Sequence, residues 1–114
     1  MTARIRPYRE TDRAAVYDVC VRTADAGEDA RGRYADDELM GDLFAGPYAA
    51  LDPQLAFVLD DGQRAVGYVL GTADTPAFVR DYRERWLPHL TARYPAPADP
   101  PVTPDDAMLA LGVI

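Results

Sequence analysis

Residues 55–72 read LAFVLDDGQRAVGYVLGT, and this stretch decides the fold that the sequence predicts. Residues 55–59 are a compact apolar run, Asp60-Asp61-Gly62 has the composition of a turn, and residues 65–72 form a second strand-like run. Two such runs joined by a short glycine-containing turn are typical of a β-hairpin. The centre of the chain is therefore expected to be two paired strands.

A strand and a helix are predicted before the hairpin. Ile5 alternates with charged neighbours and Pro7 removes a backbone donor, which indicates a short strand near a sheet edge. Thr11 and Asp12 offer N-cap oxygens, and apolar residues then recur at helical spacing up to Gly27. The prediction is a first helix of about three turns.

A second, short helix is predicted between the first helix and the hairpin. Asp36 or Asp37 can cap it, and Gly46-Pro47 closes it. Its apolar residues are Leu39, Met40, Leu43 and Phe44.

The segment after the hairpin predicts a long amphipathic helix over residues 75–94. Thr75-Pro76 has the form of an N-cap followed by proline at the first helical position. Large apolar side chains then fall on every fourth position from 78 to 94, and such a stripe is typical of packing. Because Pro88 lacks an N–H group, the helix is expected to kink or end around Trp86-Leu87.

The C-terminal part predicts a linker and a terminal helix. Residues 95–104 contain five prolines, a composition typical of a stiff extended linker. Residues 103–112 then predict the last helix. The expected element order is β-α-α-β-β-α-α, and the fold class is α/β or α+β.

Composition narrows the chemistry. The 114 residues are 48% hydrophobic, enough for one domain with its own core. A formal net charge of -7 argues against nucleic acid as a partner. The chain has no serine and no lysine, which excludes a serine triad and a Schiff-base lysine. With one cysteine, Cys20, and one histidine, His89, a metal site is not expected; we expect Cys20 to be a small buried hydrophobe and His89 a surface or partly buried imidazole.

Localisation and origin are also expectations from composition. Neither a membrane-spanning apolar run nor an N-terminal signal peptide is present in these residues, so a cytoplasmic protein without a membrane partner is predicted. All twelve basic residues are arginine, and asparagine is missing as well, which suggests a GC-rich bacterial genome.

Two segments resemble GNAT-type acetyltransferases. Residues 5–12, IRPYRETD, resemble the "I-R-P-x-x-x-x-D" start of that family, and AVGYVLG at 65–71 resembles its "x-V-G-Y-x-x-G" strand. The resemblance covers most of residues 3–73. The segment 75–94, with its Trp86-Leu87-Pro88, is similar to a bacterial subgroup related to the acetyltransferase-like domain of O-GlcNAc hydrolases.

The resemblance implies a fold, an activity and a cofactor. The fold would be the N-terminal part of a GNAT domain, a mixed three-stranded sheet with flanking helices. Residues 1–114 would form a single partial domain: core elements at 3–73, an inserted helix at 75–94, a linker at 95–104 and a terminal helix at 103–112. The activity would be acetyl-coenzyme A-dependent N-acetyl transfer, in which a neutral amine attacks the thioester with the help of a base. The catalytic residue stays unassigned.

The coenzyme site is where the sequence departs from the family. GNAT proteins hold the coenzyme pyrophosphate with a "Q/R-x-x-G-x-G/A" loop at a helix N-terminus, and none of the eight glycines of these residues has that spacing. We therefore expect no cofactor-binding residue in this chain and no activity from the chain alone. The alternative is a truncated, non-catalytic GNAT-like binding or regulatory module that acts through an open sheet edge at 65–72, by self-association or with a partner chain.

The resemblance also points to candidate residues for a small-molecule or protein amine acceptor. The loop between the first two helices borders the acceptor in this family, and its carboxylates would attract a cationic amine. The candidates there are Asp25, Glu28, Asp29 and Tyr34, for which a solvated loop is the alternative. Tyr68 and Thr72 are further candidates at the end of a strand, where strand packing explains Tyr68 equally well.

Overall fold

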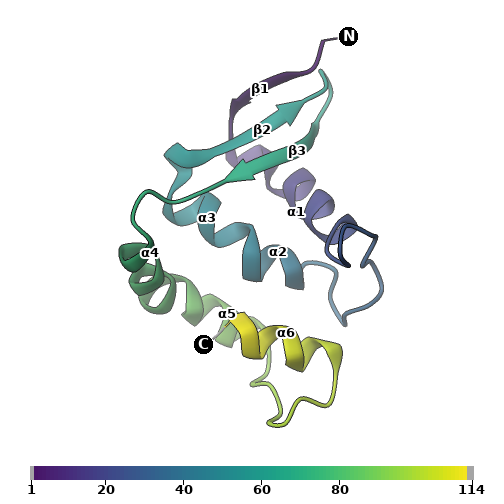
Figure 1. Cartoon of the computed structure of the whole chain (residues 1–114), viewed down its shortest axis with the longest axis vertical. Coiled ribbons are helices and arrows are strands. Elements are labelled where there is room, and N and C mark those ends of the chain that lie inside the picture. Colours follow the sequence, from purple (N-terminus) through teal and green to yellow (C-terminus); the bar gives the residue numbers. More distant parts are fainter. Residues whose placement is uncertain (1, 113–114) are drawn as a thin grey trace.

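The computed structural model of the chain, which describes residues 2–112, has a three-stranded sheet on one side and helices on the other (Figure 1). The strand order is β1-β2-β3, with β1 at Arg4–Pro7, β2 at Ala56–Asp60 and β3 at Ala65–Leu70. In its register, Val58 lies opposite both Arg6 and Tyr68. The predicted edge strand and hairpin are thus confirmed.

The hairpin turn forms because its two aspartates satisfy the backbone. The Asp60 carboxylate accepts from the Gly62 N–H at 2.7 Å, and the Asp61 carboxylate accepts from the N–H groups of Gln63 and Arg64 at 2.9 and 3.0 Å. Gly62 has a φ of 101°, a conformation that favours glycine.

The strand directions correct one expectation. Both strand pairs are antiparallel, so the sheet in residues 2–112 is not the mixed sheet that was expected. The helices between β1 and β2 return the chain to the end of β1, where the Tyr8 N–H donates to the Ala56 carbonyl at 2.9 Å. Because β2 starts beside the end of β1, it must run in the opposite direction.

The first helix is confirmed with a different beginning. A single 3₁₀ turn at Glu10–Asp12 precedes α1, which spans Arg13–Arg22. Asp12 makes no side-chain cap to α1, in contrast to the expected N-cap; its carboxylate accepts from the Arg9 N–H at 2.8 Å and from the Arg6 guanidinium. The side chain therefore ties the strand to the turn before the helix.

Two short helices follow where one was expected. α2 spans Leu39–Phe44 and α3 spans Gly46–Leu51, with a 3₁₀ turn at Pro53–Leu55 before β2. Gly46-Pro47 was expected to close the second helix, but it opens α3, because proline is well suited to the first turn of a helix. Neither Asp36 nor Asp37 is the N-cap residue of α2; that residue is Glu38, and the Asp36 carboxylate accepts from its N–H at 2.8 Å.

The segment 75–94 is a helical arm with a wide turn in its middle. It comprises α4 (Thr75–Asp81), the π-helix η3 (Tyr82–Trp86) and α5 (Leu87–Arg93). The expected irregularity at Trp86-Leu87 is confirmed, since Pro88 gives no N–H to the Glu84 carbonyl within the wide turn. The cap differs: Asp74, and not Thr75, accepts from the Ala77 N–H at 3.1 Å.

Residues 95–103 connect the arm to α6 (Pro104–Gly112) without regular secondary structure, but they bend at 99–100 and return α6 to α2, so they are not the stiff extended linker that was expected (Figure 1). At its start, the Thr103 hydroxyl accepts from the Asp106 N–H at 3.1 Å. Within residues 2–112, no helix combines the length and the apolar character that crossing a membrane requires.

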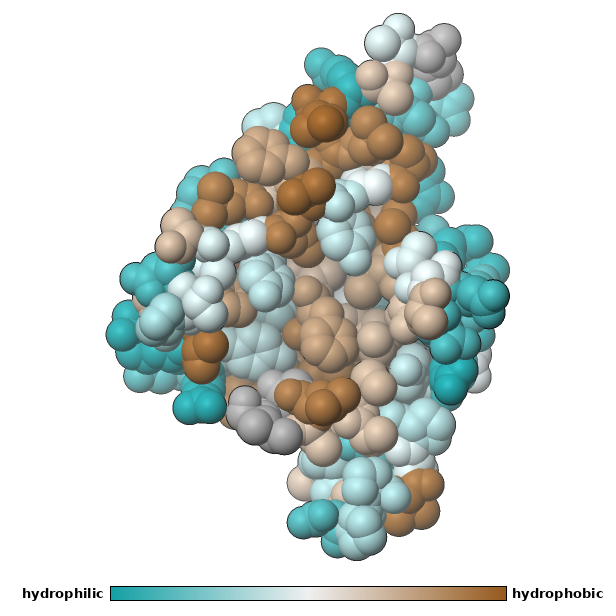
Figure 2. All heavy atoms as spheres, in the orientation of Figure 1, coloured by the Kyte–Doolittle hydropathy of each residue, from teal (hydrophilic) through white to brown (hydrophobic). Residues whose placement is uncertain are grey.

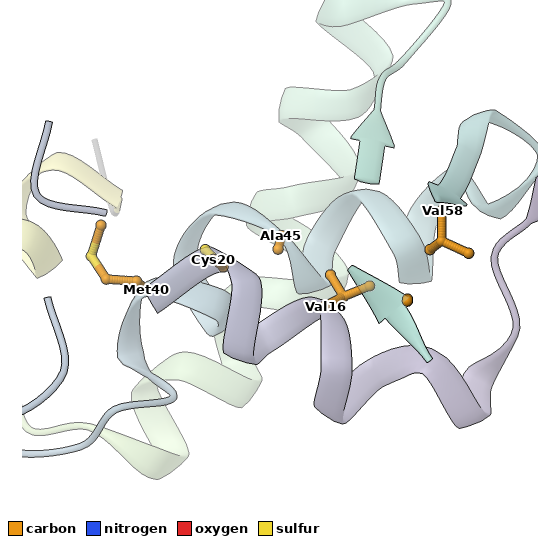
Figure 3. Close-up of a cluster of buried hydrophobic side chains, with 6 residues drawn as sticks. Val16, Cys20, Met40, Ala45 and Val58 are labelled. Carbon is orange, nitrogen blue, oxygen red and sulfur yellow. The ribbon is translucent and has the colours of Figure 1, made fainter. Parts of the chain in front are cut away.

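Two apolar clusters hold these layers together. The first lies between the inner face of the sheet and the first helices and contains Val16, Cys20, Met40, Ala45, Val58 and Ala65 (Figure 3). The second joins α2 to α5 and α6 and contains Leu39, Leu43, Leu90, Tyr94 and Leu109. The buried positions of the arm, Phe78, Leu90 and Tyr94, confirm that its stripe packs against the rest of the molecule.

Candidate functional site

The loop between α1 and α2 holds four of the predicted acceptor residues, and two of the three carboxylates among them are already paired. Asp25 lies 2.9 Å from the Arg33 guanidinium, and Asp29 lies 2.6 Å from that of Arg31. The hydrogen bond from Arg31 lowers the pKa of Asp29 to about 2, so this carboxylate is ionised at neutral pH. Among residues 2–112, Glu28 forms no ion pair, so it is the uncompensated carboxylate among the three acceptor candidates of the loop.

Tyr34, the fourth candidate of the loop, packs against the apolar interior of the molecule. Its half-buried side chain packs against both apolar clusters, and so does that of Met108 in α6. The ring thereby fastens the loop to the body of the molecule.

Tyr68 and Thr72 lie apart from this loop. Tyr68 is half-buried on the inner face of the sheet beside the cluster that contains Cys20, and burial raises the pKa of its phenol. The Thr72 hydroxyl accepts from the Asp74 N–H at 3.3 Å at the entry to α4. The structure therefore brings Asp25, Glu28, Asp29 and Tyr34 into one loop, and places the other two candidates in the sheet and at the start of the arm.

Asp42 is a buried polar centre that sequence reasoning did not single out. Its carboxylate accepts from the Tyr17 hydroxyl at 2.8 Å, the Tyr94 hydroxyl at 2.6 Å and the Arg93 guanidinium at 3.0 Å, and the residue is only 5% exposed. Its carbonyl accepts from the Trp86 indole N–H at 2.8 Å. One residue of α2 thus receives polar contacts from α1, the wide turn of the arm and its end.

The phenols at this centre remain hydrogen-bond donors over a wide pH range. Burial, followed by the hydrogen bond to Asp42, raises the pKa of both Tyr17 and Tyr94. The only sequence signal for the centre was an aspartate between the apolar positions Leu39 and Leu43, and the acidic composition of the segment concealed it.

Two glycines of α2 and α3 make room for the aromatic side chains of this centre. A Cβ at Gly41 would lie 2.5 Å from the Tyr17 ring. A Cβ at Gly46 would meet the Tyr17 hydroxyl and lie 2.9 Å from the Trp86 ring. Because ordinary carbon contacts need more than 3 Å, only glycine fits at both positions.

Arg13 lines two hollows on the helical side, one of which is also lined by Asp42. One, of about 300 Å³, lies between Arg13, Asp42, Trp86, His89, Leu90 and Arg93. The other, of about 390 Å³, has Tyr17, Asp18, Arg31, Asp37 and Glu38 among its lining residues.

Arg13 stands between these hollows and balances their acidic groups. Its guanidinium lies 4.3 Å from the centre of the Tyr17 ring, 3.5 Å from Glu38 and 3.7 Å from Asp42. In the described residues, Arg13 is therefore paired with both Glu38 and Asp42 at this position. The thiol of Cys20 is no alternative nucleophile, because burial raises its pKa.

The opposite side of the molecule is apolar and uncovered. Ile5 is 75% exposed and Val69 is 70% exposed, with Leu59 between them in the sheet at 38%. Figure 2 shows hydrophobic residues gathered over the part of the molecule that holds the sheet. In residues 2–112, β3 pairs with β2 alone, so its other edge is free.

Comparison with known proteins places this architecture. No protein-family model matches the chain. The O-GlcNAcases of Rattus norvegicus and Mus musculus are each 34% identical to it over 93 residues, which are 82% of this chain and 10% of theirs. The crystal structure of SsHAT superposes on this chain with a TM-score of 0.91 at 57% sequence identity. The match includes 97% of this chain and 55% of the SsHAT chain.

These matches confirm the two levels of the predicted relationship. The chain is related to GNAT-type acetyltransferases, as the segments 5–12 and 65–71 indicated. Within that class, it is similar to the acetyltransferase-like part of O-GlcNAcase, as the segment 75–94 indicated. It spans about half of the SsHAT chain and about a tenth of the O-GlcNAcases.

Proposed function

We propose that this chain belongs to an acetyl-coenzyme A-dependent N-acetyltransferase and forms the part that receives the amine acceptor. The observation that carries the proposal is the 57% identity to SsHAT, a histone acetyltransferase-like structure, over 97% of the chain. Identity at this level, together with the TM-score of 0.91, supports a shared reaction more strongly than a shared fold alone would.

The acceptor part rests on charge and position. Residues 25–29 present three carboxylates, of which Glu28 is uncompensated, and the whole chain has a formal net charge of -7. A cationic amine is attracted to such a surface before it loses a proton and attacks the thioester. Asp25, Glu28, Asp29 and Tyr34 are the acceptor-binding candidates of this proposal.

The described residues do not fit the coenzyme itself. A pyrophosphate needs backbone N–H groups gathered at a helix N-terminus, where negative charge is favourable. The long helices α1 and α6 begin instead beside the carboxylates of Asp12 and of Asp105 and Asp106. The positive-φ glycines lie in turns, at 27, 32 and 62. We therefore assign no step of coenzyme chemistry to these residues.

A chimera tests the proposal. Residues 1–114 replace the aligned region of SsHAT, and acetyl transfer from acetyl-coenzyme A to a panel of primary amines is measured beside SsHAT. We expect transfer to an amine within about tenfold of the SsHAT rate. A folded chimera that binds acetyl-coenzyme A and acetylates none of the amines accepted by SsHAT contradicts the proposal.

The second candidate is a non-catalytic module that acts through its sheet. The free edge of β3 and the exposed Ile5, Leu59 and Val69 favour it, because an apolar strand with unpaired backbone groups invites another chain. Self-association or a partner chain at residues 65–72 is the corresponding proposal. Two results together would favour the module over the enzyme: the folded chain associates through this edge, and the SsHAT chimera transfers no acetyl group.

A further inference from the structure

The C-terminal helix reaches back to the loop that holds the acceptor candidates. Both carboxylate oxygens of Asp105 lie 3.2 Å from the backbone nitrogen of Ala35, which donates to them across 70 residues of sequence. Asp105 is in the first turn of α6, and Ala35 follows Tyr34 in the loop. A hydrogen bond to a charged acceptor is stronger than one between neutral groups.

The same helix supports the loop through its apolar side. Met108, one turn after Asp105, packs against both apolar clusters, and Tyr34 packs against the same two clusters. A polar contact at Ala35 and apolar packing around Tyr34 therefore hold one end of the loop to α6.

The remaining polar contacts of the loop lie within the loop or run to α1 and α5; the Arg93 guanidinium at the end of α5 donates to the Asp36 carboxylate at 2.8 Å. The Ala30 N–H donates to the Val21 carbonyl of α1 at 2.9 Å, and the Gly32 N–H donates to the Asp37 carboxylate at 2.8 Å. The loop is thus held by α1 at one end and by α6 and Arg93 of α5 at the other, and α6 supplies the contact to its backbone at Ala35.

We propose that α6 positions the acceptor loop, with Asp105 as the positioning residue, so that binding of a cationic acceptor depends on the docking of α6. The inference rests on the proposed function, because it concerns the same acceptor surface. Loss of the Asp105 contact lets residues 31–37 move, and the carboxylates at 25–29 then lose their fixed arrangement toward the amine. α6 contributes to acceptor affinity by keeping the loop ordered before the acceptor binds, which lowers the entropic cost of binding.

Amide hydrogen exchange tests the docking. In the Asp105→Ala variant of the whole chain, we expect the Ala35 amide to exchange at least about fivefold faster, as for the loss of one hydrogen bond. The amides of Val16 and Cys20 in α1 serve as an internal reference and should keep their rates. The matched control is Asp99→Ala, which removes the same charge at an exposed position of the linker. Unchanged exchange at Ala35 overturns the proposal.

Titration with a short oligolysine peptide tests the consequence for binding. The probe is followed by the backbone amide shifts of residues 25–37 in wild type, Asp105→Ala, Asp99→Ala and Met108→Ala. We expect the dissociation constant to rise at least about threefold more in Asp105→Ala than in Asp99→Ala. Met108→Ala should weaken binding as well, although the net charge is unchanged, because it loosens the same docking.

The outcomes separate this inference from the proposed function. In one outcome, the wild-type chain binds the peptide at residues 25–37, and the Asp105→Ala variant binds it equally well although its Ala35 amide exchanges faster. This outcome overturns the inference and leaves the acceptor surface in place. A wild-type chain that shows no response at residues 25–37 refutes the acceptor surface, and the inference with it.

Discussion

Asp12 and Asp42 show how far single residues could be predicted. Asp12 was expected to be an N-cap, whereas its side chain binds Arg6 and the Arg9 N–H; Asp42 was not singled out from the sequence, although it is the buried polar centre of the helices. Asp42 binds Arg93 and Tyr94, which lie 51 and 52 residues away, and no local pattern encodes such a contact. Helical and strand periodicity depends on near neighbours, whereas a buried carboxylate is explained by its distant partners.

The first prediction concerns Asp42. Asp42→Ala leaves two buried phenols without their acceptor and removes one of the carboxylates paired with Arg93, so we expect a loss of about 3 kcal/mol in the free energy of unfolding. Tyr94→Phe removes one of these hydrogen bonds and keeps the ring, and should cost about 1 kcal/mol. Urea denaturation of both variants measures the two losses. A loss below about 0.5 kcal/mol for Asp42→Ala, the scale of a surface site, would show that the centre contributes nothing to stability.

The second prediction concerns Asp12 and the stability of the fold at low pH. The Arg6 guanidinium, bonded at 2.8 Å, holds the pKa of Asp12 below its usual range. A group with a lowered folded-state pKa stabilises the fold above its unfolded pKa of about 3.9, and this contribution is lost as pH falls through the folded value. We expect Asp12→Asn to cost about 1 kcal/mol at pH 7 and to make the fall in stability below about pH 4 shallower. Parallel pH curves for the variant and wild type would disprove the linkage.

At the scale of elements, patterns of short range were sufficient for most of the chain. Alternation and turn residues predicted the hairpin, and the four-residue stripe with Pro88 predicted an arm that is irregular near Trp86. The helix boundaries that were predicted wrongly lie where one residue type is compatible with two local structures. Proline after glycine can follow one helix or open another, and here Gly46-Pro47 opens α3. The antiparallel direction of the sheet required knowledge of where the helices return the chain.

The third prediction concerns the free edge of β3. Residues 65–70 expose backbone groups on one side and carry Val66 and Val69, which are 44% and 70% exposed. We expect self-association at high micromolar concentration, seen by sedimentation velocity, with slower amide exchange in β3 as concentration rises. Val69→Lys places a charge on the edge strand and should reduce this association at least about tenfold, whereas Thr75→Lys, outside the strand, should not. A strictly monomeric chain with concentration-independent exchange would be the contrary result.

At the scale of the whole molecule, the two sides differ in kind. The helical side carries ion pairs, hollows and the loop proposed to receive the acceptor, whereas the sheet side is apolar and uncovered in residues 2–112. The sequence indicated which residues are apolar, but the side on which they gather follows from the topology. The chain covers 55% of SsHAT, so its residues account for about half of that fold. The activity of the longer relative must therefore be tested apart from the binding properties of this chain.

The last prediction is that these 114 residues alone bind acetyl-coenzyme A no better than millimolar, about 4 kcal/mol of binding free energy or less. Phosphate recognition needs gathered backbone donors or paired arginines, and most arginines of the helical side, among them Arg31, Arg33 and Arg93, already face carboxylates. The formal net charge of -7 repels a polyanionic ligand at a distance, an effect that salt weakens without reversing. Isothermal titration at low and high salt, with thiol-release assays over a panel of amines, measures binding and turnover. A low micromolar dissociation constant would place a coenzyme site within the described residues.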